Sequence, residues 1–389
     1  MAKMIDHAIL SASGAHRWSV CTPSARLEEK FPKKSSEYAE EGTAAHALAE
    51  LVAKYYLGEL SEMDYENRRD ELAKGTYYNA EMQECANDYG RLVLETFKAA
   101  QERSEDAFVE LEARVDFSKY VKDGFGTGDC IIVADKTLEI IDFKYGKGVR
   151  VEAAGNPQMK LYAIGALLKY STLFDIDTVR MTIFQPRLPG EQSSDEITVD
   201  ELTEWAEKFI KPRAKLAYKG EGEFAPSEET CKFCRAKEQC KARAEYNLKL
   251  FDEAPDALLI TPEEAGKILE KAKDIRAWLE DLEKLVSTTL LNGTPVTGWK
   301  LVEGRSKRRF TDELKVAEAM KAAGYDEALL YKRELITLTQ MEKDFGKKAV
   351  AEVLGSLIEK PRGKPTLAPA SDKKPEYKFD EQIVKAFDE

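Results

Sequence analysis

No run of apolar residues in this 389-residue chain approaches the roughly 20 positions that a membrane-spanning helix needs. The first residues, MAKMIDHAILSASGAHRW, also lack the apolar core of a secretory signal peptide. These two absences argue against a membrane protein and against a secreted one. We therefore expect a cytoplasmic protein that contacts no membrane.

An excess of basic residues is also missing. The chain has 59 Lys and Arg against 71 Asp and Glu, a formal net charge of −12, whereas nucleic-acid coat proteins usually carry a basic excess. A localised basic groove stays compatible with this balance, because phosphate binding depends on the field at the contact surface. The 43% hydrophobic content and the length fit a soluble globular protein of two domains, or one large decorated domain.

Cysteine is scarce, and its six positions are unevenly placed. In a cytoplasmic chain they are poor candidates for disulfides. Cys231, Cys234 and Cys240 follow a C-x₂-C-x₅-C spacing and supply three thiolates from one loop, and Cys21 is the obvious fourth ligand. Such a set suits either a [4Fe–4S] cluster or a structural Zn²⁺. We assign the two other cysteines to the packed core: Cys85 and Cys130.

The most informative stretch of the sequence runs from Gly126 to Tyr162. Two runs rich in Ile and Val, Cys130–Ala134 and Leu138–Ile141, flank a turn at Asp135–Thr137. This pattern predicts adjacent strands of a hairpin. Together with its surroundings it predicts an α/β (α+β) core in the order helix, three-stranded meander, helix, strand. The predicted elements cover residues 38–56, 108–117, 128–134, 138–144, 156–170 and 178–186, with an amphipathic helix at 200–216.

Five polar side chains belong to this stretch. Asp129 starts the first hairpin strand, and Asp142 and Lys144 leave the end of the second from one face. Gln158 and Tyr162 lie four apart on the following helix and share a face. Two carboxylates and an ammonium suit Mg²⁺ or Mn²⁺ chemistry on a phosphate, because hard cations prefer oxygen ligands. A plain surface ion pair of Asp142 with Lys144 is the simpler alternative, but the ordered set G-x-x-D, D-x-K, Q-x-x-x-Y is much more specific than D-x-K.

This ordered set resembles the RecB-like branch of the PD-(D/E)XK nuclease superfamily. The N-terminal pattern L-S-x-S followed by C-x-P is similar to the members that carry an iron–sulfur cluster; here it consists of Leu10, Ser11, Ser13, Cys21 and Pro23. The resemblance implies a restriction-endonuclease-like core and a [4Fe–4S] cluster on Cys21, Cys231, Cys234 and Cys240, with zinc as the alternative.

The same resemblance implies roles for the site residues. His46, which follows E-G-T, would ligate the metal with Asp129, Asp142 and the carbonyl of Phe143. Lys144 would position the attacking water and stabilise charge on the phosphate, and Gln158 and Tyr162 would hold the substrate strand. Three further residues are weaker candidates: Glu41 and Glu50 for supporting contacts, and Arg187 as either a phosphate contact or an ordinary surface arginine.

The whole chain also resembles a family of phage and prophage proteins built on such a core, through E-G-T-A-A-H, D-F-K-Y-G-K-G and the late G-K-P-T-L-A-P. This implies the cytoplasm of a bacterial host cell, DNA ends or single strands as substrate, and phage replication or recombination proteins as partners. The first hypothesis is a metal-dependent deoxyribonuclease, more narrowly an exonuclease. The alternative is a non-catalytic DNA-binding or assembly protein on the same scaffold with a structural zinc site.

We expect three regions along the chain: residues 1–245 as the nuclease domain, 246–360 as a mostly helical accessory region, and 361–389 as a flexible tail rich in Pro, Lys and Ser. The accessory region contains a basic run that could contact the DNA backbone: Arg305, Lys307, Arg308 and Arg309.

Overall fold

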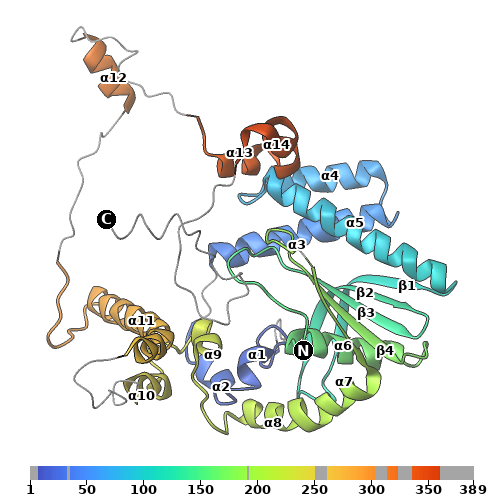
Figure 1. Ribbon diagram of the computed structural model, residues 1–389, viewed down its shortest axis with the longest axis horizontal. Helices are drawn as coiled ribbons and strands as arrows, with labels where there is room; N and C mark the ends of the chain where they lie inside the picture. Colours follow the sequence, from blue (N-terminus) through green and yellow to red (C-terminus); the bar gives the residue numbers. More distant parts are fainter. Residues whose placement is uncertain are drawn as a thin grey trace, which may run out of the picture.

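The computed structural model describes residues 8–32, 36–190, 192–249, 261–302, 313–322 and 335–359. A five-stranded mixed sheet in the order β1-β2-β3-β4-β5 lies at the centre, with helices on both faces (Figure 1). The strands are β1 Phe108–Asp116, β2 Phe125–Ala134, β3 Thr137–Phe143, β4 Thr178–Phe184 and β5 Gln192–Thr198. The first three form an antiparallel meander, β4 is parallel to β3, and β5 is an antiparallel edge strand. The predicted α+β core order is confirmed; β5 was not predicted.

The hairpin between β2 and β3 turns on two residues, Asp135 and Lys136, with φ angles of 46° and 62°. Two left-handed residues in succession are typical of the type I′ turn, whose twist matches that of the paired strands. The turn is thus one residue shorter than predicted, and Thr137 already pairs with Ala134. This tight connection fixes the register that places the end of β3 beside the middle of β2.

Helix α6 (Pro157–Tyr170) forms the crossover from β3 to β4 and covers one face of the sheet. Asn156 caps it by accepting hydrogen bonds from the amides of Gln158 and Met159, and Pro157 stands at the first position, where a missing amide costs nothing. On the same face lie α7 (Val199–Trp205), a π-helical turn (η1, Ala206–Ile210) and α8 (Lys211–Lys219). The single helix expected over 200–216 is therefore interrupted, just before Pro212, which has no amide to donate.

The opposite face is covered by α3 (Glu37–Tyr56) and α5 (Ala80–Arg103), with α4 (Glu62–Ala73) packed against α3 (Figure 1). Helix α3 starts at Glu37 because the side chain of Ser36 accepts a hydrogen bond from the amide of Ala39. Cys85 and Cys130 are buried in this second core, as predicted.

Short helices at the start of the chain meet the segment that carries the later cysteines. These are α1 (Ala15–Trp18) and α2 (Ser24–Glu28) at the N-terminus, and α9 (Glu228–Lys232) and α10 (Lys241–Lys249) after the core. Glu28 connects the two segments: it pairs with Arg17 at 3.0 Å and accepts a 2.8 Å hydrogen bond from the amide of Arg235.

The later part of the chain is mostly helical where the structure describes it. Its helices are α11 (Pro262–Leu291), α12 (Glu313–Ala322), α13 (Leu338–Phe345) and α14 (Lys347–Leu354), followed by the 3₁₀ turn η3 (Gly355–Leu357). The start of α14 is held to α5, because the amides of Lys347 and Lys348 both donate to Glu84. The basic run 305–309 and the tail 361–389 lie outside the described residues, and the division of the chain at residues 245 and 360 stays a prediction. None of the helices in the described ranges is both long and apolar enough to span a bilayer.

Candidate metal centre

Glu112 and Asp129 occupy matching positions where the pairing of β1 with β2 is interrupted. Their neighbours pair on both sides, Leu111 with Cys130 and Ala113 with Gly128. Glu112 has a φ of 49°, in the left-handed region that a glutamate rarely adopts. Leu111 packs toward the α3–α5 core, whereas Ala113 packs toward the α6 core, although residues two apart in a regular strand share one face. The backbone of β1 therefore reverses its alternation at Glu112.

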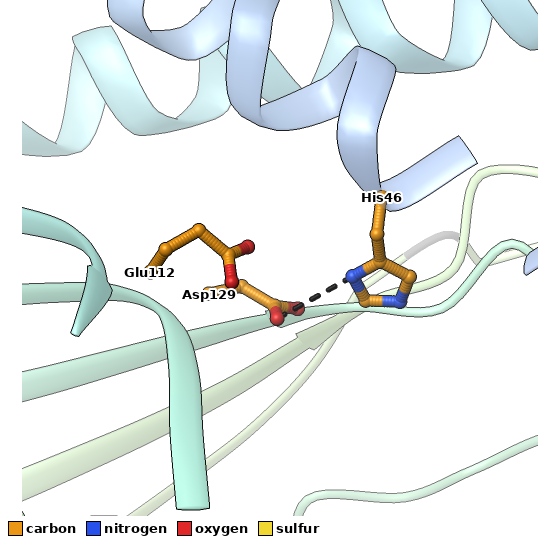
Figure 2. A group of neighbouring side chains, drawn as sticks. All are labelled: His46, Glu112 and Asp129. Atoms are coloured by element: carbon orange, nitrogen blue, oxygen red, sulfur yellow. Dashed lines mark ion pairs between the residues drawn. The ribbon is translucent and has the colours of Figure 1, made fainter. Parts of the chain in front are cut away.

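This interruption brings three potential metal ligands together. One ligand atom each from His46, Glu112 and Asp129 lies within 4.8 Å of the others. Figure 2 shows the imidazole reaching down from α3 to the two carboxylates, with Nδ1 of His46 3.4 Å from Oδ1 of Asp129. Carboxylate oxygens and an imidazole nitrogen form a donor set that suits a divalent cation. Glu112 was missed by sequence reasoning, because a regular strand would have placed it among the half-exposed charged residues of β1.

Asp129 is also connected to the end of β3. Its Oδ2 accepts a 2.7 Å hydrogen bond from the amide of Phe143. The preceding residue, Asp142, is 2% exposed, and its Oδ2 lies 3.0 Å from Nζ of Lys144 without accepting a hydrogen bond of good geometry. A buried carboxylate oxygen that accepts no hydrogen bond is typical of a metal ligand before its ion is bound.

Helix α6 supplies the remaining polar groups. Nε2 of Gln158 lies 3.4 Å from Oδ1 of Asp142 and 3.2 Å from the hydroxyl of Tyr162, and its Oε1 lies 3.5 Å from Nζ of Lys144. The structure thus brings together every residue of the predicted main site, from β2, the end of β3 with the residue after it, and helices α3 and α6. Their catalytic and ligand roles remain predictions.

The charges of this site depend on one another. Burial alone would lower the pKa of His46, but the hydrogen bond and negative charge of Asp129 outweigh burial and raise it. Burial raises the pKa of Asp142 even though Lys144 stands beside it. The pKa of Lys144 is raised as well, because the attraction of Asp142 and Asp129 exceeds the cost of its burial. Burial, and next the charge of Asp129, raise the pKa of Glu112 to about 7. A cation placed among these groups would relieve this crowding of negative charge.

The weaker candidates have other partners. Arg187 is not on the surface: its guanidinium lies 2.9 Å from Glu81, 3.4 Å from Glu41 and 4.3 Å from the centre of the Tyr145 ring. The expectation of an ordinary surface arginine is therefore wrong, and a phosphate contact of Arg187 stays a prediction. Glu50 pairs with Lys54 at 2.5 Å, one turn along α3.

The four cysteines of the predicted second metal site line one small cavity between the N-terminal segment and the α9–α10 region. Within the described ranges, no three of their sulfur atoms lie within 4.8 Å of one another. A tetrahedral Zn²⁺ with Zn–S bonds of about 2.3 Å requires sulfur–sulfur distances of about 3.8 Å. The cavity therefore does not have the spacing of a preformed zinc site, and a bound cluster of this segment stays a prediction.

The fold and the site define a three-layer α+β protein with a histidine–carboxylate group that could hold a metal ion. The chain belongs to the family described as "Protein of unknown function (DUF2800)", which matches residues 7–375.

Solved structures with a local likeness include the alkaline exonuclease LHK-Exo from Laribacter hongkongensis, at 15% identity over 45% of this chain and 87% of that one, with a TM-score of 0.21. LHK-Exo in complex with dAMP matches at 16% identity, covering 46% of this chain and 93% of that one, with a TM-score of 0.22. SSO0001 matches at 18% identity, 57% and 95% coverage, and a TM-score of 0.23.

Proposed function

We propose that this protein is a metal-dependent deoxyribonuclease, and more narrowly an exonuclease that hydrolyses phosphodiester bonds at DNA ends or in single strands. The observation that carries the proposal is the Asp129–Phe143 hydrogen bond of 2.7 Å. It joins the strand that bears Asp129 to the strand end that bears Asp142 and Lys144. Carboxylates, a half-buried ammonium and an amide side chain thereby converge on one spot, an arrangement suited to phosphoryl chemistry.

The donor set around Asp129 fits a divalent ion. Asp129, Asp142 and the Phe143 carbonyl would hold it on the side of Lys144, and His46 and Glu112 offer further ligands on the other side of Asp129. Mg²⁺ or Mn²⁺ bound there would neutralise negative charge on the scissile phosphate and favour attack by water.

The residues around the carboxylates have separate tasks. Lys144 stays protonated, because Asp142 and Asp129 raise its pKa, and its ammonium would orient the water and stabilise charge that develops on the phosphate. Gln158 bridges Asp142 and Tyr162, and these two side chains of α6 would hold the substrate strand. The resemblance to RecB-like nucleases implies a product with a 5′-phosphate.

For the four cysteines we favour a structural [4Fe–4S] cluster over zinc, as the resemblance to the cluster-bearing RecB-like nucleases implies; within the described residues no three of their sulfurs are close enough together for a preformed zinc site. Cys21 comes from the N-terminal segment and the others from the segment after the core. A cluster there would cross-link these two segments. It would act on folding, not on the phosphate.

Digestion of end-labelled DNA tests the proposal. Linear single- and double-stranded substrates are incubated with Mn²⁺, Mg²⁺ or EDTA, beside a closed circular DNA. We expect nucleotide release from linear DNA with either metal, none in EDTA, and resistance of the circle. Cleavage of the circle would make the protein an endonuclease. Binding of DNA without cleavage under any metal would instead favour the non-catalytic DNA-binding or assembly protein. In either case we expect a bacterial host cell and phage replication or recombination proteins as partners.

A further inference from the structure

An open groove of about 810 Å³ lies between the β1–β2 connection and helix α8. Five lysines line it, and we call it the lysine groove. Two of them, Lys119 and Lys122, stand on the connection, and Lys211, Lys215 and Lys219 stand on α8. All five side chains belong to exposed residues. In a chain with a formal net charge of −12, such a concentration of one sign marks a surface for an anionic ligand.

Few carboxylates offset these lysines. The groove is lined by Asp123, which accepts a 3.0 Å hydrogen bond from the hydroxyl of Tyr218, and by Glu207, which pairs with Lys211 at 2.7 Å. Within the part of the chain that the structure describes, Lys119, Lys122 and Lys215 have no carboxylate within 4.0 Å. The positive charges of these three lysines are therefore not balanced by a carboxylate in contact.

The aromatic rings of the groove are occupied. Nζ of Lys122 lies 4.3 Å from the centre of the Tyr218 ring, whose environment also includes the guanidinium of Arg26 at 4.7 Å. Tyr120 is 5% exposed. Binding of single strands through their bases depends on open rings on which the bases stack. The groove offers charge without such a platform, so it suits a phosphate backbone and not exposed bases.

The spacing and the position of the lysines fit a linear polyanion. Lys211, Lys215 and Lys219 follow one another at intervals of four on α8, which places them on one face with a rise of roughly 6 Å between neighbours. The groove also lies at the end of the sheet where β3 ends, since β2 starts at Phe125 and reaches Asp129 after roughly 13 Å. Gly126, between the two, packs so closely on Tyr162 that an added Cβ would lie 2.7 Å from the ring.

We propose that the lysine groove binds the sugar–phosphate backbone of DNA and leads one strand toward Asp129. The direction toward the candidate metal centre rests on the proposed nuclease function, whereas backbone binding in the groove does not. The contacts are sequence-independent, because lysines on a flexible stem act as point charges on phosphates.

Direct binding in EDTA, where no cleavage is expected, tests this inference on the full chain. The triple variant Lys119→Ala, Lys122→Ala, Lys215→Ala is compared with wild type on labelled DNA of two unrelated sequences, over a series of salt concentrations. We expect the affinity at low salt to fall about tenfold or more for both sequences. The slope of log K against log salt should flatten by up to about three counterions.

Two further variants separate charge placement from total charge and from folding. Replacing Lys74, Lys98 and Lys241 with Ala removes the same charge from exposed positions outside the groove and should leave the affinity near wild type. Replacing the three groove lysines with Arg should keep backbone binding. If the Ala variant of the groove binds DNA with wild-type affinity and salt slope, the groove assignment is wrong, even where nuclease activity is found. If wild type binds DNA through the groove but never cleaves it, the nuclease proposal is wrong and the proposal that the lysine groove binds DNA is supported.

Discussion

The amide of Phe143 donates a 2.7 Å hydrogen bond to Oδ2 of Asp129, while Oδ1 of the same carboxylate lies 3.4 Å from Nδ1 of His46. Asp129 is thus oriented from two directions, by the end of β3 and by α3. A carboxylate held in this way loses little further rotamer freedom when it binds a cation. The hydrogen bond also fixes the distance between the two predicted metal-binding aspartates, because Asp142 directly precedes Phe143.

Replacing Asp142 with Asn should reduce the rate of DNA cleavage by on the order of 10²-fold or more, because a neutral amide can no longer serve as an anionic metal ligand. Asn keeps the size of the side chain, so circular dichroism should show a folded protein. Asp135→Asn is the matched control: it lies exposed in the same hairpin at a φ of 46°, which Asn tolerates. Wild-type turnover in Asp142→Asn would show that the active site lies elsewhere.

Glu112→Gln should weaken Mn²⁺ binding to the full-length protein without unfolding it. The carboxylate belongs to the three-residue group with His46 and Asp129, and loss of one anionic ligand lowers affinity for a divalent ion, here by about tenfold. Calorimetry, or the electron paramagnetic resonance signal of free Mn²⁺, measures this without any turnover. Glu110→Gln lies on the same strand, paired with Lys169 at 2.7 Å, and should leave Mn²⁺ affinity unchanged. Equal affinities for wild type and Glu112→Gln would remove Glu112 from the site.

The stability of the metal-free protein should depend on pH through Glu112. Burial and the charge of Asp129 raise the pKa of this carboxyl to about 7 in the folded state, above its usual value of about 4.3 in an unfolded chain. The folded state therefore binds more protons between these values, and the free energy of unfolding falls as pH rises through them. In EDTA at pH 8, Glu112→Gln should be more stable than wild type by on the order of 1 kcal/mol, after allowance for solvent screening. Urea unfolding at pH 5 and pH 8 measures the difference; identical pH profiles for the two proteins would contradict it.

Anaerobically purified protein should be brown and contain iron and sulfide. Changing any one of Cys21, Cys231, Cys234 or Cys240 to Ser should remove the colour and lower solubility, because a missing thiolate releases the segments that the cluster joins. Changing Cys85 to Ala should leave the colour intact, since Cys85 is buried in the α3–α5 core. A colourless protein with one zinc would decide for the zinc alternative and leave the nuclease proposal untouched.

The core of this fold and most of the candidate site could be predicted from the sequence. The runs of Ile and Val that became β2 and β3 are short and bounded by turn residues, and motif residues at their ends were bound to meet once the hairpin formed. Glu112 was not predictable in this way, because its place in the candidate site depends on a local reversal of the strand's side-chain alternation. This reversal occurs at a φ of 49°, and the local sequence gives no sign of it. The edge strand β5 was missed because its sequence, QSSDEIT, has one strongly apolar residue and no alternation of apolar and polar residues. Its alternation is visible only in the burial of the folded strand. Arg187 was misread because its partners, Glu41 and Glu81, come from helices more than 100 positions earlier in the chain.

Asp281→Asn in the full-length protein tests the predicted boundary near residue 245. Arg243, which is 3% exposed, is paired with Asp281 of α11 at 2.5 Å and lies 4.0 Å from Asp274. Removing one partner of a buried ion pair leaves the other charge with too few partners. Because Asp274 remains near Arg243, we expect the free energy that holds α11 in place to fall by on the order of 3 kcal/mol. If residues 246–360 are an accessory region, this loss should appear as easier proteolysis between α10 and α11, while the rate of DNA cleavage per folded molecule stays within about twofold of wild type. Lys284→Ala, which removes a pair with Glu238 at 3.5 Å on the exposed side of α11, should change neither quantity. A drop in cleavage that follows the detachment of α11 would show that the nuclease unit extends beyond residue 245.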